Sequence, residues 1–390
     1  MKKDSKLDLI NIEAIRNILT LRYDPHGPTF LPKLSWENFI EYNGVAQFVP
    51  TLLEGVVKRM VQTDAPRKIG IGISGGVDST TVLCILRKCF PKQEINTFCI
   101  TFGEDDKEAK DAEYVAEIYS TNHKHIVIEN PLADLEEQIR IVNEPRWNLY
   151  PYYLFAEASK DCDLLFTGDG GDELFGGYVF RYQYVLQQKT EPLVKRYLEA
   201  HNRDWVDDQK ELFKFPFDWN GIYNLLNLYF DNPLPVLGKT FLADYNGKLL
   251  YDFSRTNNAF SRHFHLKMAA PMLEPEILHI STHIPYNLKY DVKNNIGKLI
   301  LRQILLENSG YKPATKAKIG WGMNTVWMWD KHAREMCMEL FDSARLIELG
   351  IINKNWIPKG MRKADEHDPR YINKMLGLLA LEIWLKVKGL

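Results

Sequence analysis

The segment SGGVDS places two hydroxyl groups, two glycines and one carboxylate within six residues. Ser74 and Ser79 can hydrogen-bond phosphate oxygens, and Gly75 and Gly76 let a ligand approach the backbone closely. Asp78 stands where the commonest phosphate-binding loop would carry a lysine, and a carboxylate beside phosphates makes sense if it binds Mg²⁺. The segment therefore indicates a phosphate site with a metal ion. The alternative is a tight turn with an aspartate that caps a helix.

A second segment, TGDGGDELFGGY at residues 167–178, places three acids among five glycines directly after the apolar stretch DLLF. Like charges at one edge of a sheet need a cation, and a magnesium–pyrophosphate complex supplies one. The alternative is a glycine-rich hairpin or an acidic surface loop. Three acids in so short a stretch favour the binding site.

Strands alternate with helices through the first half of the chain, which predicts a parallel sheet with right-handed crossovers. Both glycine-rich segments follow strands, so both should lie at the carboxyl edge, where such sheets bind ligands. We expect an α/β fold with helices on both faces of the sheet, followed by a mainly helical C-terminal region without clear strands. The division expected is 1–50, 51–185 for the α/β core, and 186–390 for the helical part. The expected strands are KIGIGIS, INTFCITF, HKHIVIE and DLLF.

Composition is that of a globular enzyme: 45% of the 390 residues are hydrophobic, and the formal net charge is −2. Lys and Arg form no stripe, so nothing predicts nucleic-acid binding. The five cysteines include no C-x-x-C pair, which favours free thiols in a reducing compartment. No signal peptide and no apolar stretch long enough to span a membrane is found, so we expect a cytoplasmic protein.

Taken together, the motifs resemble those of known families. SGGVDS resembles the pyrophosphate loop of ATP pyrophosphatases, whose fold is adenine nucleotide alpha-hydrolase-like, and TGDGGDELFGGY resembles the signature of asparagine synthetase-type enzymes. The resemblance implies ATP, cleaved between its α and β phosphates, and Mg²⁺. It implies that Asp78 and Asp172 bind the metal, and that Gly168 and Gly170 lie at the pyrophosphate. Asp169 stands where many relatives carry a glutamate near the reacting carboxylate.

The resemblance extends over most of the chain. LRYDPHGPTF resembles the linker that follows the glutaminase domain of that family, and LGLLALEIWLK resembles its closing helix. GKLILRQIL and KAKIGWGM resemble two motifs whose lysines approach pyrophosphate and the adenylate. Lys298 and Lys318 are therefore expected to stabilise charge that develops on these groups. For each lysine, the alternative is a solvated surface charge.

Two features depart from the family pattern. Relatives that use glutamine begin with a cysteine nucleophile in a glutaminase domain, whereas position 2 here is Lys2 and only about 50 residues precede the first expected core helix. We therefore expect nitrogen from free ammonia, from a separate glutaminase subunit, or from an amine on a substrate. Relatives also carry E-x-R-x-P-F-L-D at the acceptor pocket, where this chain has Lys267 and Ala269 at the Glu and Arg positions.

The sequence thus predicts an ATP-dependent ligase that adenylates a small-molecule carboxylate and then forms an amide, with asparagine from aspartate as the default. Amidation or lactam formation on another metabolite or peptide carboxylate is the alternative. A different carboxylate would explain the altered acceptor motif, and so would local drift with aspartate still bound by other residues. A tRNA-thiolating enzyme would need an RNA-binding module and paired cysteines, and a silent scaffold would not need both acidic motifs. The sequence leaves a homodimer open.

Overall fold

The chain is described by a computed structural model that covers residues 10–103, 107–201, 206–309, 325–341 and 344–390. Five strands form one sheet and two more form a hairpin. The strands are β1 (Ile69–Gly72), β2 (Ile95–Thr101), β3 (Asn122–Val127), β4 (Leu164–Phe166), β5 (Lys267–Ala269), β6 (Tyr290–Asp291) and β7 (Ile296–Gly297).

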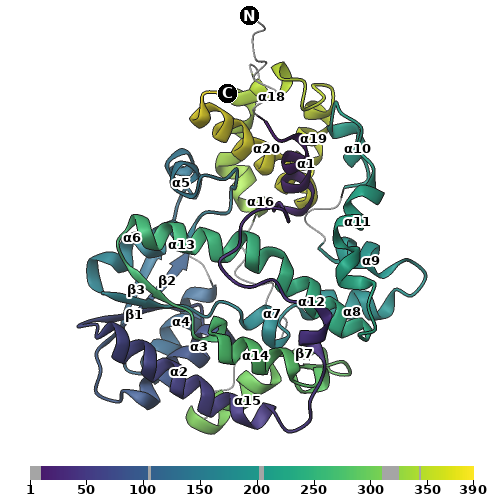
Figure 1. Cartoon of the computed structure of the whole chain (residues 1–390). Helices are drawn as coiled ribbons and strands as arrows, with labels where there is room; N and C mark the ends of the chain where they lie inside the picture. Colours follow the sequence, from purple (N-terminus) through teal and green to yellow (C-terminus); the bar gives the residue numbers. More distant parts are fainter. Residues whose placement is uncertain (1–9, 104–106, 202–205, 310–324, 342–343) are drawn as a thin grey trace, which may run out of the picture.

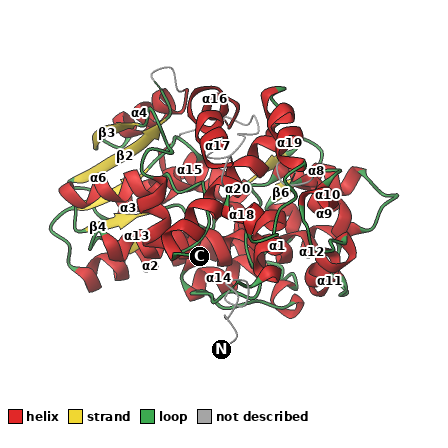
Figure 2. Cartoon of the chain, turned by 90° about the horizontal axis from the view of Figure 1, so that it is seen from above, coloured by secondary structure: helices red, strands yellow, loops and turns green. Residues whose placement is uncertain are grey.

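Helices make up most of the remaining described chain, as Figure 2 shows in red. The α-helices up to the middle of the chain are α1 (Ile12–Leu21), α2 (Val49–Asp64), α3 (Val77–Cys89), α4 (Lys107–Ile118), α5 (Leu135–Val142), α6 (Pro151–Asp161), α7 (Gly171–Phe175), α8 (Val179–Gln187), α9 (Leu193–Ala200), α10 (Gln209–Leu212) and α11 (Trp219–Phe230). Those that follow are α12 (Val236–Asp244), α13 (Ser254–His263), α14 (Pro275–His283), α15 (Leu299–Ser309), α16 (Thr325–Met328), α17 (Arg334–Phe341), α18 (Arg345–Glu348), α19 (Trp356–Asp365) and α20 (Pro369–Lys388).

The five-stranded sheet is parallel throughout, in the order β3-β2-β1-β4-β5. The chain runs outward from β1 through β2 to β3 and then returns to the other side of β1, so β1 and β4 flank a topological switch point. The predicted α/β class is confirmed. The expectation of no strand after residue 185 was wrong, because β5 pairs with β4 in the register Leu164↔Lys267. A three-residue edge strand is too short to show an alternating pattern.

Helices cover both faces of the sheet. Helices α3 and α4 follow β1 and β2 on one face, and α6 crosses the other face against β1, β2 and β3. The glycines of KIGIGIS allow α6 to come close to β1. A Cβ on Gly72 would lie 2.9 Å from Leu154 Cδ2, and one on Gly70 would lie 2.5 Å from Cys162 Sγ. The alternating glycines therefore reflect packing against α6 as well as strand structure.

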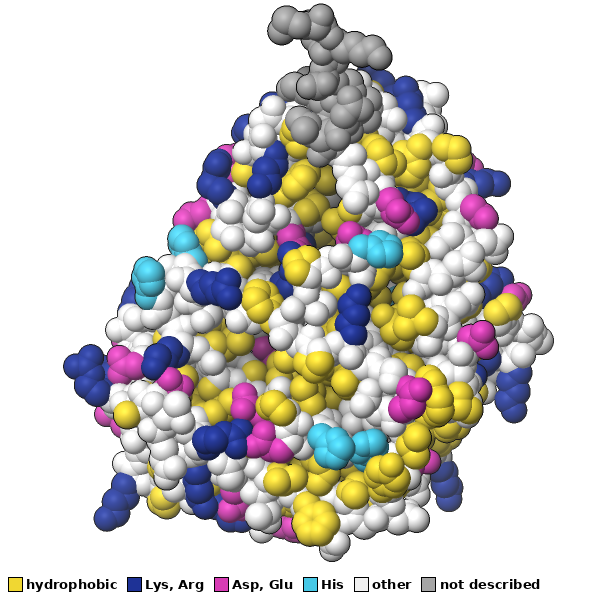
Figure 3. All heavy atoms as spheres, viewed as in Figure 1, with side chains coloured by type: hydrophobic (Ala, Val, Ile, Leu, Met, Phe, Trp, Pro, Cys, Tyr) yellow, Lys and Arg dark blue, Asp and Glu magenta, His cyan; other side chains and the backbone are white. Residues whose placement is uncertain are grey.

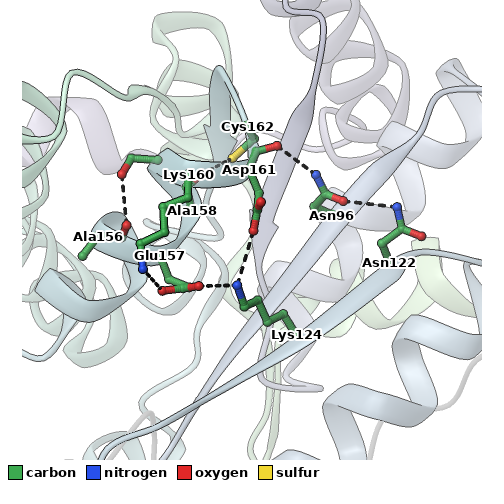
Figure 4. A network of polar contacts seen from close by, with 10 residues as sticks. Asn96, Asn122, Lys124, Ala156, Glu157, Ala158, Lys160, Asp161 and Cys162 are labelled. Carbon is green, nitrogen blue, oxygen red and sulfur yellow. Dashed lines mark hydrogen bonds and ion pairs between the residues drawn. The ribbon is translucent and has the colours of Figure 1, made fainter.

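A polar network ties α6 to the amino ends of β2 and β3 (Figure 4). Asn96 Nδ2 donates to the Asp161 carbonyl at 3.1 Å, and Asn122 Nδ2 donates to Asn96 Oδ1 at 3.3 Å. Lys124 pairs with Glu157 and lies 3.5 Å from Asp161 Oδ2. These contacts lie at the edge opposite the carboxyl ends, so they stabilise the frame of the sheet without entering the predicted site.

A long broken helix runs across the molecule from α6 to α8, through the labels α13 and α12 of Figure 1. Helix α12 leads directly into a π-helical segment, η4 (Tyr245–Phe253), and then into α13. The helical path is interrupted at Gly247, where φ is −101° and ψ is −121°. Such π segments cost regular hydrogen bonding and often occur at functional sites.

The C-terminal helices pack beside α1 at the end of the molecule away from the sheet (Figure 1). Helix α20 begins at Pro369 behind Asp368, whose side chain accepts a hydrogen bond from the Arg370 N–H. In the part of the chain that the structure describes, no helix is long and apolar enough to cross a membrane. Positive and negative side chains are scattered among hydrophobic ones over the face in Figure 3.

Candidate active site

The loop after β1 has the geometry of an anion-binding turn. Gly75 has a φ of +66°, which favours glycine, and a Cβ there would lie 2.5 Å from Asp111 Cβ. Gly76 is the N-cap of α3, so the first turn of that helix directs its free N–H groups toward the loop. Asp78 and Ser79 lie in this first turn, and Ser74 lies between β1 and the glycines.

The second glycine-rich loop, between β4 and α7, packs directly on the first. A Cβ on Gly171 would lie 2.2 Å from Asp78 Cγ, and one on Gly168 would lie 2.7 Å from the Ser79 backbone nitrogen. Gly170 has a φ of +90° and faces Leu273. The predicted meeting of both motifs at the carboxyl ends of β1 and β4 is confirmed, and the glycines are there because the loops touch.

Two acids and one lysine converge at this junction. The Lys298 ammonium lies 2.6 Å from Asp172 Oδ1 and hydrogen-bonds Asp78 Oδ2. Lys298 follows β7 with a φ of +60°, a conformation that is costly for a residue with a side chain, and its N–H donates to the Phe175 carbonyl at 3.1 Å. A Cβ on Gly177 would lie 1.7 Å from Asp172 Oδ1. The hairpin and the glycine pair after α7 therefore fix the lysine between the carboxylates.

Burial and charge oppose each other in this cluster. Burial, together with the Asp172 carboxylate, raises the pKa of Asp78 to about 6, although Lys298 holds it down. Burial favours the neutral amine of Lys298, yet Asp172 and Asp78 together raise the pKa of that ammonium above its ordinary value. The lysine is thus charged at neutral pH, and it lowers the pKa of Asp78 below the value that burial alone would give.

The oxygen atoms present fit one Mg²⁺ ion that takes some of its ligands from the protein and the others from a substrate. Asp78 Oδ1 and Ser79 Oγ are both buried without a hydrogen-bond partner among the described residues. No cluster of three or more His, Cys, Asp or Glu side chains that could hold a metal occurs in the described ranges. Mg²⁺ is typically bound by one or two carboxylates together with phosphates and water. Asp78 and Asp172 match that pattern, and Lys298 holds the cation position between them.

Asp169 lies beside this cluster and has a different environment. Its Oδ2 accepts a 2.7 Å hydrogen bond from Asn257 Nδ2 on α13. Burial raises the pKa of Asp169, whereas Asn257 and Thr167 hold it down. Hydrogen bonds from neutral side chains therefore stabilise the ionised form of the Asp169 carboxyl.

A buried polar network supports the far side of α7. Tyr178 donates to Glu173 at 2.5 Å, and burial together with Asp172 raises the pKa of Glu173 to about 8. Arg181 stacks on Tyr178 and pairs with Asp244, the last residue of α12. This buried pair joins α8 to α12, and it therefore fixes the start of α8, which directly follows the loop that carries Gly177.

The two residues that depart from the expected acceptor motif are placed on β5. Lys267 is exposed and pairs with Asp64 Oδ1 at 2.6 Å, away from the carboxyl edge. Ala269 is buried, and its carbonyl accepts the Thr167 N–H at 2.9 Å. Lys318 lies outside the described residues, so its role stays a prediction.

Sequence reasoning missed Asn257 and underused Arg302. Asn257 lies 88 residues beyond Asp169, and no motif surrounds it. Arg302 is part of GKLILRQIL; it helps to hold down the pKa of Asp78, and its Nε donates to the Gly297 carbonyl at 2.9 Å. The spacing from Lys298 to Arg302, one helical turn, was the available signal.

Comparison with known proteins gives a family match over residues 49–386, to the model described as asparagine synthase. The chain is similar to a Methanocaldococcus jannaschii protein that carries the name of a glutamine-hydrolysing asparagine synthetase, with 34% identity over 33% of this chain and 25% of that protein. It is also similar to the Bos taurus asparagine synthetase, with 28% identity over 38% of this chain and 28% of that enzyme. The matched part thus spans about a quarter of these relatives. A solved NAD⁺ synthetase from Burkholderia pseudomallei covers 60% of this chain and 94% of its own at 15% identity and a TM-score of 0.27, too low for a conclusion.

Proposed function

This chain belongs to the asparagine synthase family, and we propose that it is an ATP-dependent, AMP-forming carbon–nitrogen ligase. The observation that carries the proposal is the convergence of Asp78, Asp172 and Lys298 beside the N-terminus of α3. An anion-binding turn, two carboxylates and a partly buried cation together suit a magnesium-bound triphosphate.

In the proposed reaction, a substrate carboxylate attacks the α-phosphorus of ATP, and the bond to the β-phosphate oxygen breaks. The N–H groups of the loop and the Ser79 hydroxyl bind the phosphates, and Lys298 stabilises the charge that develops on the leaving pyrophosphate. Mg²⁺ held by Asp78 and Asp172 would neutralise the same charge. Lys318 remains a proposed second cation for the adenylate.

In the second step, a nitrogen nucleophile attacks the acyl carbon, and AMP leaves with the carbon–oxygen bond electrons. The nucleophile loses a proton as the amide forms, and we assign Asp169 to the end of the site where this occurs. Its carboxylate is suited to that role because burial raises its pKa toward the range in which a proton can be accepted.

The acceptor is proposed as a small-molecule carboxylate, with aspartate as the default. Amidation or lactam formation on another carboxylate is a second candidate, because Lys267 is turned to Asp64 and Ala269 brings no charge to the carboxyl edge. Ammonia, a substrate amine, or ammonia from a separate glutaminase subunit would supply nitrogen.

The test is product analysis with ATP, Mg²⁺, ammonium and a panel of carboxylates that begins with aspartate. AMP and pyrophosphate should form in equal amounts with one of these acceptors. Asp78→Asn should abolish the reaction, while the matched change Asp64→Asn, of an acid outside the site, should not. Release of ADP and inorganic phosphate would refute the proposal.

A further inference from the structure

Helix α13 approaches the site through one polar side chain, Asn257. The side chain is 8% exposed, and its amide donates to Asp169 Oδ2 at 2.7 Å. Among the described residues, burial raises the pKa of Asp169, and Asn257 and then Thr167 lower it. The amide of Asn257 is thus the main group in the described chain that stabilises this carboxylate.

The fold holds Asn257 in place from both sides. One turn further along α13, Phe260 is fully buried, and its ring packs against Tyr152 and Phe155 of α6. Residues three apart share a helix face, so the face that packs on α6 also directs Asn257 to the end of β4. Before α13, the π segment η4 ends at a buried ion pair in which Asp252 lies 3.2 Å from Arg146 Nη1. Rotation of α13 would break these contacts.

We propose that Asn257 is a positioning residue that fixes one oxygen of Asp169 and thereby directs the other oxygen to the reacting end of the acceptor. This inference rests on the proposed function and deepens it, because it assigns the orientation of the group that receives the proton. A carboxylate held by one neutral amide rotates when that amide is lost. It also loses its main source of charge stabilisation.

The neighbouring residue supplies a matched control. Asn258 has the same side chain on the same helix, but its amide donates at 2.7 Å to the Ser254 carbonyl inside the helix. A loss of helix stability should affect both variants, whereas a loss of positioning should affect only Asn257.

The experiment compares Asn257→Ala, Asn257→Asp and Asn258→Ala by steady-state kinetics across pH 5.5–9 and by the ionisation of Asp169. The ionisation is read from the ¹³C carboxyl signal that is missing in Asp169→Asn. In Asn257→Ala we expect kcat to fall roughly 10- to 100-fold with the KM for ATP unchanged, the size of one hydrogen bond to a charged group. The acidic limb of the pH profile and the ¹³C titration should both move to higher pH, because the lost bond had lowered the pKa of Asp169.

Asn257→Asp should move both further, since it places a second carboxylate against the first. Asn258→Ala should move neither. If the ¹³C titration of Asp169 is the same in wild type and Asn257→Ala, or if activity falls by one factor at every pH, the positioning role is refuted. If wild type releases ADP and phosphate, the proposed function fails, and the ¹³C titration still decides whether Asn257 controls Asp169.

Discussion

Lys289 is a buried lysine, and it gives a prediction that does not depend on the reaction. Its side chain is 1% exposed, and its ammonium has no hydrogen-bond partner in the described chain. The nitrogen lies 4.7 Å from the centre of the Phe241 ring and 5.9 Å from that of Tyr286. Burial lowers the pKa of Lys289 to about 7, and Glu41 opposes this only in part. Folding therefore costs free energy whenever this amine is protonated.

The size of the cost follows from the gap between the pKa of Lys289 when folded, about 7, and its ordinary value of 10.5. Between these values the unfolded chain binds the extra proton, so the free energy of unfolding rises with pH by about 1.36 kcal/mol per pH unit. The whole gap corresponds to on the order of 5 kcal/mol, and the window from pH 7 to pH 9 to roughly 2 kcal/mol. Below pH 7 both states are protonated and the deficit is largest.

Lys289→Met removes the charge and keeps an apolar side chain of similar length. Urea unfolding at pH 6, 7, 8 and 9 should show the variant more stable than wild type at pH 6, with the advantage shrinking as pH rises. Lys293 is an exposed lysine at the tip of the β6–β7 hairpin, which directly follows Lys289. Lys293→Met should have the same stability as wild type at every pH. A stability difference between Lys289→Met and wild type that does not change from pH 6 to pH 9 would show that the amine is not buried as described.

Three further outcomes follow from the site. Gly177→Ala should lower kcat by on the order of 100-fold with the fold intact, because a Cβ would lie 1.7 Å from Asp172 Oδ1 and 2.4 Å from Lys298 Cε. The control is Gly55→Ala, where the added Cβ meets nothing within 4 Å. Unchanged turnover in Gly177→Ala would contradict the geometry. Asp172→Asn should cost several kcal/mol of transition-state stabilisation, as Asp78→Asn should, and near-normal turnover at saturating Mg²⁺ would remove that residue from the metal site. The purified 390-residue chain should use ammonium or a substrate amine but not glutamine, because glutamine hydrolysis needs a reactive cysteine nucleophile. Four of its five cysteines are buried, and burial raises the thiol pKa of the fifth, Cys89. Glutamate release from glutamine would contradict this prediction.

The sequence predicts the part of the site that is local along the chain. Each glycine-rich motif directly follows its strand, so the parallel sheet and the meeting of Asp78 with Asp172 could be inferred from spacing. Lys298 could be inferred only through family resemblance, because nothing near it in the sequence indicates two carboxylates.

Other features depend on contacts that no local pattern records. The β5 strand has three residues and no apolar alternation, so its pairing with β4 is decided by tertiary packing. Asn257 is one of two asparagines on α13, and only the phase of the helix after η4 selects it. Lys289 appears as an ordinary charged residue in the sequence, since complete burial of a lysine runs against the usual distribution.

The distance between paired segments along the chain also governs how the protein folds. β5 follows β4 by 103 residues in the register Leu164↔Lys267, and the contact of Lys298 with Asp78 closes a separation of 220 residues. Contacts of such high sequence separation form late, because the entropy of loop closure is lost before they stabilise the chain. Until residue 269 has emerged from the ribosome, β5 cannot pair with β4. The β4 strand of the nascent chain is then an open sheet edge, which is a template for aggregation. The cluster of Asp78, Asp172 and Lys298 can therefore assemble only after about three quarters of the chain has been synthesised.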